Sequence, residues 1–500
     1  MTVINSNIKA LKAQASGENN SRRLDNAMER LATGARINSA KDDAAGLGIA
    51  TKMTAQINGL NQAIRNANDG LSMVNTIEAS LQQSSTILQR IRELAVQSAN
   101  DSNSVEDRQF LQSEIVQMQA ELDRIANQSR YNGMKVLDGT FTNKQVQIGA
   151  NGYETLSFNL DAASSADVGA HQKRLGTMGA VAADTDLNSA GSPVTASTMT
   201  VSGYLGTTTV SIAPDSSARS AAIAVNNKSA TTGVSAQAVT KAKINSFSAA
   251  GTVTFDVRGK NTSSTVTVSA TLTSTSDLTS LSNAFNLVSA QTGITSELGS
   301  DKTFIILTNS EGYDIGLSGH TNSAGTEATV AVTGMTGDGT TTVESAITVT
   351  GTASLDTTRV VGDLLFSSSK AFTLKDTAGT IGTDAFAGTS AQSSALAAVS
   401  GVSVATASGA ALAIDIVDGA IAKVSNMRAD LGAVASRLEK TVDALTAAST
   451  NVSAARSRIQ DADYSVETTN LSKAQIIAQA STAMLAQANQ QASIVLSLLK

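Results

Sequence analysis

The chain has 500 residues, of which 3% are aromatic and none is Trp or Cys. A chain of this length exceeds what one hydrophobic core usually organises, so we expect several domains. The lack of cysteine excludes disulfides, thiol catalysis and Cys-based zinc sites, and His171 and His320 lie in no metal-ligand spacing. The net charge of -6 argues against nucleic acid as a partner, because phosphate binding needs a basic face.

Neither end of the chain shows a membrane or secretion signal. The first residues, MTVINSNIKALKAQ, lack the basic, apolar and cleavage regions of a secretory signal. No run of 18 apolar residues predicts a membrane span. We therefore expect no membrane partner, and any export of the chain must depend on some other feature.

The first 31 residues predict a helix with one narrow apolar stripe. The stripe consists of Val3, Ile4, Ile8, Leu11, Ala15, Leu24, Met28 and Leu31. Gly34 ends this helix, and a connector rich in Gly, Ala and charge follows. No neighbouring segment covers the stripe, so it needs a partner elsewhere.

Residues 44–100 predict one long helix, because apolar residues recur there at steps of four and three. This seam consists of Leu60, Ile64, Ala67, Leu71, Val74, Ile77, Leu81, Ser84, Leu88, Ile91 and Ala95. Ser104 is a predicted N-cap for a second helix, with Glu106 and Asp107 in its first turn. We expect both helices to share one core.

The dipeptides Asn132-Gly133, Asp138-Gly139 and Asn151-Gly152 predict hairpin turns beside short alternating strands. Beyond Leu160 the sequence becomes rich in Ser, Thr and Gly, and alternation of β-branched and small residues predicts an all-β insert. Disorder is the alternative for such a composition, and the alternation disfavours it. Within it, Ala221–Ala236 aligns with Leu281–Ser296 as an internal repeat that suggests two related subdomains.

Helical periodicity returns at Leu412 and breaks at the sequence RIQDADY. The returning seam consists of Val424, Met427, Leu431, Val434, Leu438, Thr441, Leu445, Ala448 and Val452. The last 30 residues predict one more helix, whose uncovered stripe consists of Ile477, Ala480, Met484, Ala488, Gln491, Val495 and Leu499. We expect this stripe to pair with the first 31 residues, in the same chain and in neighbouring chains.

The sequence therefore predicts a multidomain α + β chain in which N- and C-terminal helices pair into a coiled-coil and helical-bundle core around a Ser/Thr/Gly-rich all-β insert. We expect three parts. They are a terminal coiled-coil domain (1–43 and 457–500), a helical bundle with a small β-hairpin region (44–175 and 408–456) and a variable β-rich outer domain (176–407).

Several motifs resemble those of the bacterial flagellins. They are RLATGARINSAKDDAAGLGIA, LQRIRELAVQSAN, YNGMKVLDG, SRIQDADY, AMLAQANQ and the terminal VLSLLK. They occur in the family order, and the similarity covers about residues 1–165 and 410–500. Ala35, where a larger residue is usual, and Gly48, where Ala is common, depart mildly from the family pattern.

The resemblance implies a structural subunit, not an enzyme, that self-assembles without cofactors or metals into a helical flagellar filament. It further implies export through the flagellar type III apparatus with a chaperone, addition beneath a cap protein, and an extracellular location. A hook-filament junction protein that shares the terminal helices is the alternative. A peptidase carried in the insert is a weaker one, since the sequence has no HExxH motif.

Two sets of residues are candidates for function. The expected assembly interface comprises Ile4, Ile8, Leu11, Leu24, Leu31, Ile477, Met484, Val495 and Leu499. By resemblance, Arg90, Leu94 and Glu114, with Gln89 nearby, contribute to recognition by the flagellin-sensing Toll-like receptor. Helical geometry places Leu94 off the seam, so its alternative and main expected role is packing against a neighbouring subunit.

Overall fold

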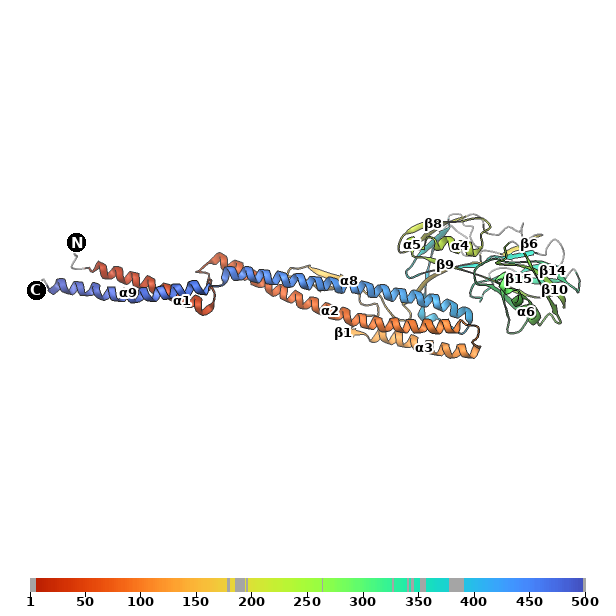
Figure 1. Cartoon of the computed structure of the whole chain (residues 1–500), viewed down its shortest axis with the longest axis horizontal. Coiled ribbons are helices and arrows are strands. Elements are labelled where there is room, and N and C mark those ends of the chain that lie inside the picture. The colour runs from red at the N-terminus through yellow and green to blue at the C-terminus, as the bar shows by residue number, and fades with distance from the viewer. Residues whose placement is uncertain are drawn as a thin grey trace. The chain divides into compact units, whose positions relative to one another are not determined.

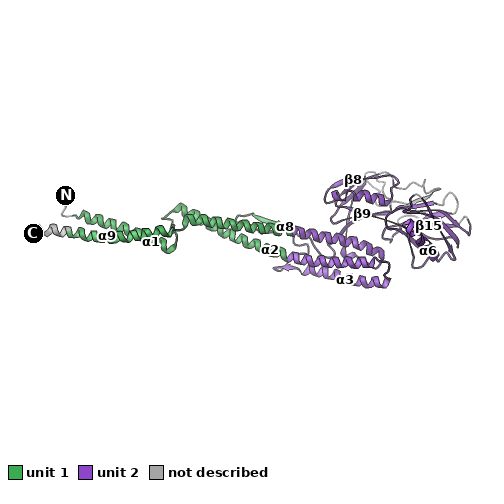
Figure 2. Cartoon of the chain, in the orientation of Figure 1, with its two compact units in different colours: residues 1–75, 143–158, 432–500 green, residues 76–142, 159–431 purple. Residues whose placement is uncertain are grey.

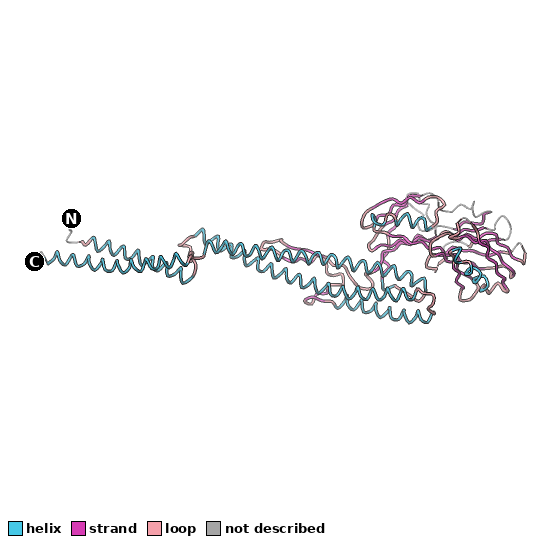
Figure 3. The backbone as a smooth tube through the Cα atoms, in the orientation of Figure 1, coloured by secondary structure: helices cyan, strands magenta, loops and turns pink. Residues whose placement is uncertain are grey.

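The computed structural model describes residues 6–177, 180–184, 194, 197–262, 264–325, 328–339, 341–342, 346–350, 357–376 and 391–497. The chain forms two compact units, coloured separately in Figure 2. The first comprises residues 1–75, 143–158 and 432–500, and the second comprises residues 76–142 and 159–431. The predicted fold class is confirmed, since terminal helices pack together and the central region consists of antiparallel strands (Figures 1 and 3). The three predicted domain boundaries stay predictions.

In the described part of the chain, five long helices carry the apolar periodicity of the N- and C-terminal regions. They are α1 (Ile8–Thr33), α2 (Ala44–Ser98), α3 (Val105–Gln128), α8 (Ala407–Gln460) and α9 (Tyr464–Ser497). Every predicted seam residue of α2 and α8 is buried or half-buried, which confirms those two seams. The apolar residues at three- and four-residue spacing therefore drive the packing of both helices.

The start of α3 is fixed by a capping box. The backbone N–H of Asp107 donates to Ser104 Oγ at 3.1 Å, and Asp107 Oδ2 accepts from the backbone N–H of Ser104 at 2.9 Å. The Ser104 hydroxyl also donates to Asp107 Oδ2 at 2.7 Å, and this bond, together with the one from the Ser104 backbone N–H, lowers the pKa of Asp107. A cap of this kind contributes about 1 kcal/mol to a helix. The predicted N-cap is therefore confirmed.

Two small hairpins follow α3. Strands β1 (Arg130–Tyr131) and β2 (Met134–Lys135) flank Asn132 and Gly133, whose φ angles of 47° and 80° are those that a tight hairpin turn requires. Strands β3 (Lys144–Gln147) and β4 (Thr155–Phe158) pair antiparallel in the first unit.

The described strands of the insert form three antiparallel sheets. Their strand orders are β11-β10-β14-β17-β6, β12-β13-β9-β18-β5-β21 with β15 and β16 attached through β9, and β20-β19-β7-β8. The strands are β5 (Gly169–Thr177), β6 (Ala180–Asp184), β7 (Ser197–Ser202), β8 (Thr207–Ile212), β9 (Ser235–Asn245), β10 (Gly251–Arg258), β11 (Val266–Leu272), β12 (Thr295–Leu298), β13 (Phe304–Asn309), β14 (Ile315–Asn322), β15 (Thr329–Met335), β16 (Ile347–Thr350), β17 (Thr357–Val360), β18 (Asp363–Ser368), β19 (Thr373–Asp376), β20 (Gln392–Ser393) and β21 (Ala395–Ala398), and a short 3-10 helix (Val399–Gly401) follows.

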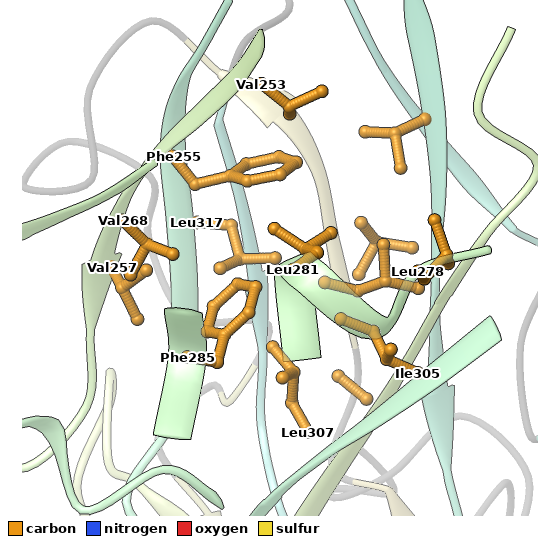
Figure 4. Close-up of a cluster of buried hydrophobic side chains, with 14 of the residues drawn as sticks. Val253, Phe255, Val257, Val268, Leu278, Leu281, Phe285, Ile305, Leu307 and Leu317 are labelled. Atoms are coloured by element: carbon orange, nitrogen blue, oxygen red, sulfur yellow. The ribbon is translucent and has the colours of Figure 1, made fainter. Parts of the chain in front are cut away.

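Two hydrophobic clusters hold these sheets together. One surrounds Phe255 and Phe285, which lie among aliphatic side chains in Figure 4. The other surrounds Val201, Phe366 and Phe372. Each cluster lies beneath one copy of the internal repeat, so each copy has its own apolar support.

Both copies of the repeat form the same helix–turn–strand unit. The helices are α4 (Ala218–Asn226) and α5 (Ser229–Thr232) in the first copy, and α6 (Thr279–Leu287) and α7 (Ser289–Thr292) in the second. The side-chain amide of Asn226 donates to Ala236 O at 2.9 Å and accepts from Ala236 N at 2.8 Å. Asn286 makes the same two bonds to Ser296, at 2.9 and 2.7 Å.

A glycine closes each of these units. Gly233 and Gly293 have φ angles of 73° and 70°, a left-handed conformation that only glycine adopts without strain. The aligned asparagines and glycines of the sequence repeat therefore have one physical cause: each asparagine ties its helix to the following strand, and each glycine turns the chain between them.

Candidate assembly interface

The two ends of the chain meet in the first unit, where α1 and α9 lie side by side (Figure 1). Many of their Cα atoms lie within 8 Å of one another. Each Cα atom lies about 2.3 Å from its helix axis, so such distances are those of two helices packed directly against each other.

The contact is a regular seam of mostly small residues at steps of three and four. It consists of Ala10, Ala13, Gly17, Asn20, Leu24, Ala27 and Leu31 from α1, and Glu467, Leu471, Ala474, Ala478, Ser481, Leu485 and Ala488 from α9, all of them buried or half-buried. This is the spacing of a two-stranded coiled coil. The seam therefore pairs the first and last helices within one chain.

Two asparagines set the register of the pair. Asn20 Nδ2 donates to Ala474 O at 2.7 Å, and Asn20 is only 4% exposed. Near the start of α1, Asn7 Nδ2 donates to Ala488 O at 3.1 Å, and Asn7 Oδ1 caps α1 by accepting from Ala10 N. A polar residue at a seam position favours the one alignment in which its hydrogen bond forms.

An ion pair stabilises the other end of the seam. Arg30 Nη1 lies 3.0 Å from Glu467 Oε1, and Glu467 is 7% exposed. A carboxylate this deeply buried needs its partner, because an unpaired buried charge is costly. The pair therefore reinforces the alignment that the asparagines select.

The connector after α1 is bonded to the junction between α8 and α9. Arg36 N donates to Gln460 O at 2.6 Å, and Ala462 N donates to Gly34 O at 2.9 Å. The Arg36 guanidinium also donates to Ile459 O at 2.7 Å. These bonds hold both helices of the pair at a common base.

Large apolar side chains of the pair remain exposed to solvent. On α1, Ile8 is 50% exposed, Leu11 60% and Met28 49%; on α9, Ile476 is 66% exposed and Met484 64%. Complete burial of one such side chain is worth about 1.5–3 kcal/mol. The pair thus carries apolar surface that another molecule would cover with a gain in free energy.

Within one chain, the expected pairing stripe is covered only in part. Leu24, Leu31 and Ile477 are half-buried, whereas Ile8, Leu11 and Met484 are exposed. The expected contacts of these exposed side chains with neighbouring chains stay predictions. The prediction weighted side chains by their hydrophobicity, whereas the covered seam consists mostly of small ones. Of the remaining candidates, Ile4 and Leu499 lie outside the described residues, as does the side chain of Val495.

The expectation that Leu94 lies off the core is also wrong, because Leu94 is 1% exposed. Arg90, one turn earlier on the same face of α2, lies 2.9 Å from Glu114 of α3 and 3.1 Å from Glu93. α3 thus lies along this face, and Leu94 belongs to the core of the second unit. Gln89 and Arg90 are exposed and Glu114 is half-buried, so these three are the accessible members of the set.

Sequence reasoning missed Asn7, Asn20, Arg30 and Glu467. The available signal was the recurrence of small and polar residues at heptad spacing beside the more hydrophobic stripe. Among the described residues no group of three or more His, Asp or Glu is placed to hold a metal. No helix in the described part of the chain is long and apolar enough to cross a membrane.

Comparison with known proteins covers the whole chain. Residues 4–142 match the bacterial flagellin N-terminal helical region, and residues 414–499 match the bacterial flagellin C-terminal helical region. The chain is 40% identical to the B-type flagellin of Pseudomonas aeruginosa, over 99% of both chains. It is 34% identical to a flagellin of Salmonella typhimurium, over 100% of this chain and 99% of that one.

Among solved structures, FliC from Burkholderia pseudomallei aligns with 74% of this chain and 99% of its own length. The identity is 19% and the TM-score is 0.29.

Proposed function

The chain belongs to the bacterial flagellins and is a subunit of the flagellar filament, and we propose that its α1–α9 pair is the element through which copies polymerise. One observation supports this proposal: mostly small residues form the contact within the chain, and five large apolar side chains of the pair remain exposed. They are Ile8, Leu11, Met28, Ile476 and Met484. Contact with neighbouring copies would remove these side chains from water, a gain that is absent from the free subunit.

The assembly interface of this proposal has two layers. Leu24, Leu31 and Ile477 support the pair within one chain, whereas Ile8, Leu11 and Met484 contact other copies. We also propose Ile4, Val495 and Leu499 as members of this interface. A contact of this kind between different patches of successive copies does not close into a ring and so builds a helical filament.

The route to the filament follows from the family. We propose that the chain is exported through the flagellar type III apparatus with a chaperone, and is added beneath a cap protein to an extracellular filament. The composition suits this route, because a chain with no cysteine and two prolines has no disulfide and few slow isomerisation steps to delay refolding.

The second candidate set concerns a host receptor. We propose that Gln89, Arg90 and Glu114 form the accessible part of a surface recognised by the flagellin-sensing Toll-like receptor in the free subunit. In the filament, the same surface would pack against a neighbouring subunit. Leu94 supports both roles from beneath, by holding α2 against α3.

The family is one of structural proteins, and we propose no catalytic activity for this chain. The alternative of a hook-filament junction protein is the weaker one, because the sequence relatives that span the whole chain are named flagellins.

Deletion of residues 471–500 tests the proposed function. We expect the truncated chain to remain a soluble monomer, because it loses most of α9, while the full chain forms long filaments under the same conditions. Sedimentation and electron microscopy measure both outcomes. Normal filaments from the truncated chain would contradict the proposal, and so would failure of the full chain to polymerise.

A further inference from the structure

The α1–α9 pair has a polar groove along one flank. Its volume is about 310 Å³, and its lining comes from both helices: Asn20, Arg23, Asn26, Ala27 and Arg30 of α1, and Glu467, Asn470, Lys473, Ala474 and Ile477 of α9. The one carboxylate in it, that of Glu467, is already bonded to Arg30 at 3.0 Å and to Asn470 Nδ2 at 3.4 Å. The remaining charges are cationic.

Arg23 and Lys473 face the groove from opposite helices and form no ion pair with any residue that the structure describes. Both are exposed. Two unpaired cations beside three asparagine side chains form a surface that suits a carboxylate, which accepts hydrogen bonds from both kinds of group.

The same helix carries matching acids on a different flank. Glu18, Asp25 and Glu29 are exposed and form no ion pair within the described part of the chain. At 3.6 residues per turn these three acids share one ridge of α1 with Arg22, so the ridge carries three negative charges and one positive charge. The ridge lies about 140° around the helix from Arg23. An acidic ridge and a basic groove therefore lie on separate sides of one helix.

We propose that the basic groove (Arg23 and Lys473) of one copy receives the acidic ridge (Glu18, Asp25 and Glu29) of a second copy. This inference rests on the proposed function, polymerisation through the α1–α9 pair. It adds which charged groups of successive copies meet and in which direction the copies follow one another. Groove and ridge are different patches, so the contact is head-to-tail and leaves one free groove and one free ridge at the ends of any assembly. Charge complementarity also disfavours a symmetric contact, in which groove would meet groove and ridge would meet ridge, because like charges would then face each other.

Neighbouring arginines provide a matched test. Arg23→Glu places a negative charge in the groove, whereas Arg22→Glu makes the same change on the acidic ridge, at an angle of about 40° from Glu18. At about 0.15 M NaCl we expect Arg23→Glu to raise the critical concentration of the full chain about fivefold, since an exposed pair is worth up to about 1 kcal/mol. Arg22→Glu is expected to leave it unchanged or lower it.

Charge exchange tests the pairing itself. A chain with Arg23→Glu and Lys473→Glu is expected to polymerise poorly, as is a chain with Asp25→Lys and Glu29→Lys. The chain with all four substitutions restores opposite charges across the contact and is expected to regain most of the lost polymerisation. Such recovery would also show that these exposed positions tolerate the changes.

The outcomes separate two failures. If the wild-type chain does not polymerise, the proposed function is overturned together with this inference. If the wild type polymerises but Arg23→Glu and Arg22→Glu have equal critical concentrations, or the fourfold variant stays as defective as the double variants, only the groove-and-ridge contact is overturned.

Discussion

The side-chain amide of Asn20 donates a 2.7 Å hydrogen bond to the backbone carbonyl of Ala474, which joins the first helix of the chain to the last. The bond lies in a seam of small residues, where only one alignment of α1 and α9 lets it form. Contacts within one chain are therefore sufficient to define the register of the two helices.

Replacing Asn20 by Ala should loosen this pair. The loss of one buried hydrogen bond costs about 1 kcal/mol, so amides of α9 near Ala474 should exchange with solvent about fivefold faster. Hydrogen exchange measured by mass spectrometry checks this, with the exposed neighbour Asn19→Ala as control. Equal exchange rates in the two variants would show that the bond does not set the register.

Leu94 should behave as a core residue. Leu94→Ala removes a fully buried side chain and is expected to destabilise the second unit by about 2–5 kcal/mol. Val96→Ala, at a position that is 47% exposed, should change stability by about 0.5 kcal/mol or less. Denaturant unfolding followed by circular dichroism measures both, and a Leu94→Ala variant as stable as Val96→Ala would contradict the packing described here.

Receptor signalling distinguishes the two roles of this face. Since Leu94 is buried, loss of signalling in Leu94→Ala should follow its loss of stability and return at lower temperature, where the fold is populated. Arg90→Ala should lose signalling at either temperature, because Arg90 is exposed. Loss of signalling in a fully folded Leu94→Ala subunit would instead indicate direct contact.

Asp314 should make the stability of the insert depend on pH. Burial raises the pKa of Asp314 to about 6, although the guanidinium of Arg359, whose Nε lies 2.7 Å from Oδ2, opposes the shift. The other oxygen, Oδ1, has no hydrogen-bond partner among the described residues. Because the folded state then binds a proton more tightly than the unfolded state, this group's contribution to stability falls as pH rises from about 4 to about 6.

The comparison of wild type with Asp314→Asn isolates this effect. The Asn variant cannot ionise, so the difference between its unfolding free energy and that of the wild type should change by up to about 2 kcal/mol across that pH range. Above about pH 7, where Asp314 is ionised in both the folded and the unfolded state, the difference should be constant. A difference that is flat from pH 4 to 7 would show that Asp314 is ionised throughout.

Much of the fold was predictable because the responsible residues act locally or repeat regularly. The seam from Leu60 to Ala95 predicted the buried face of α2, and Ser104 predicted the start of α3. The aligned Asn226 and Asn286 indicated a repeat in the sequence. The reason for these asparagines, two hydrogen bonds from each side chain to the following strand, became visible only in the structure. In each case the sequence signal and the structural cause involve the same side chains.

The site was less predictable, for two physical reasons. In the α1–α9 pair the contacting residues are small, so the hydrophobic pattern pointed instead to Leu11 and Met484, which face away from the partner helix. In α2, the periodicity predicted a single buried face and placed Leu94 outside it. The packing of α3 against α2 buries a second face, which includes Leu94. Contacts between separate elements decided both cases.

Met484 provides the most direct test of assembly through the outward side chains of α1 and α9. The chain has no cysteine, so Met484→Cys introduces a single thiol whose reaction with a maleimide reports its accessibility. Leu287→Cys, at an insert position that is 85% exposed, is the control. We predict that the thiol at position 484 reacts readily in the monomer and at least about tenfold more slowly in the filament, as expected for a buried side chain, while the thiol at position 287 reacts similarly in both. Equal labelling of position 484 in monomer and filament would contradict assembly through this face.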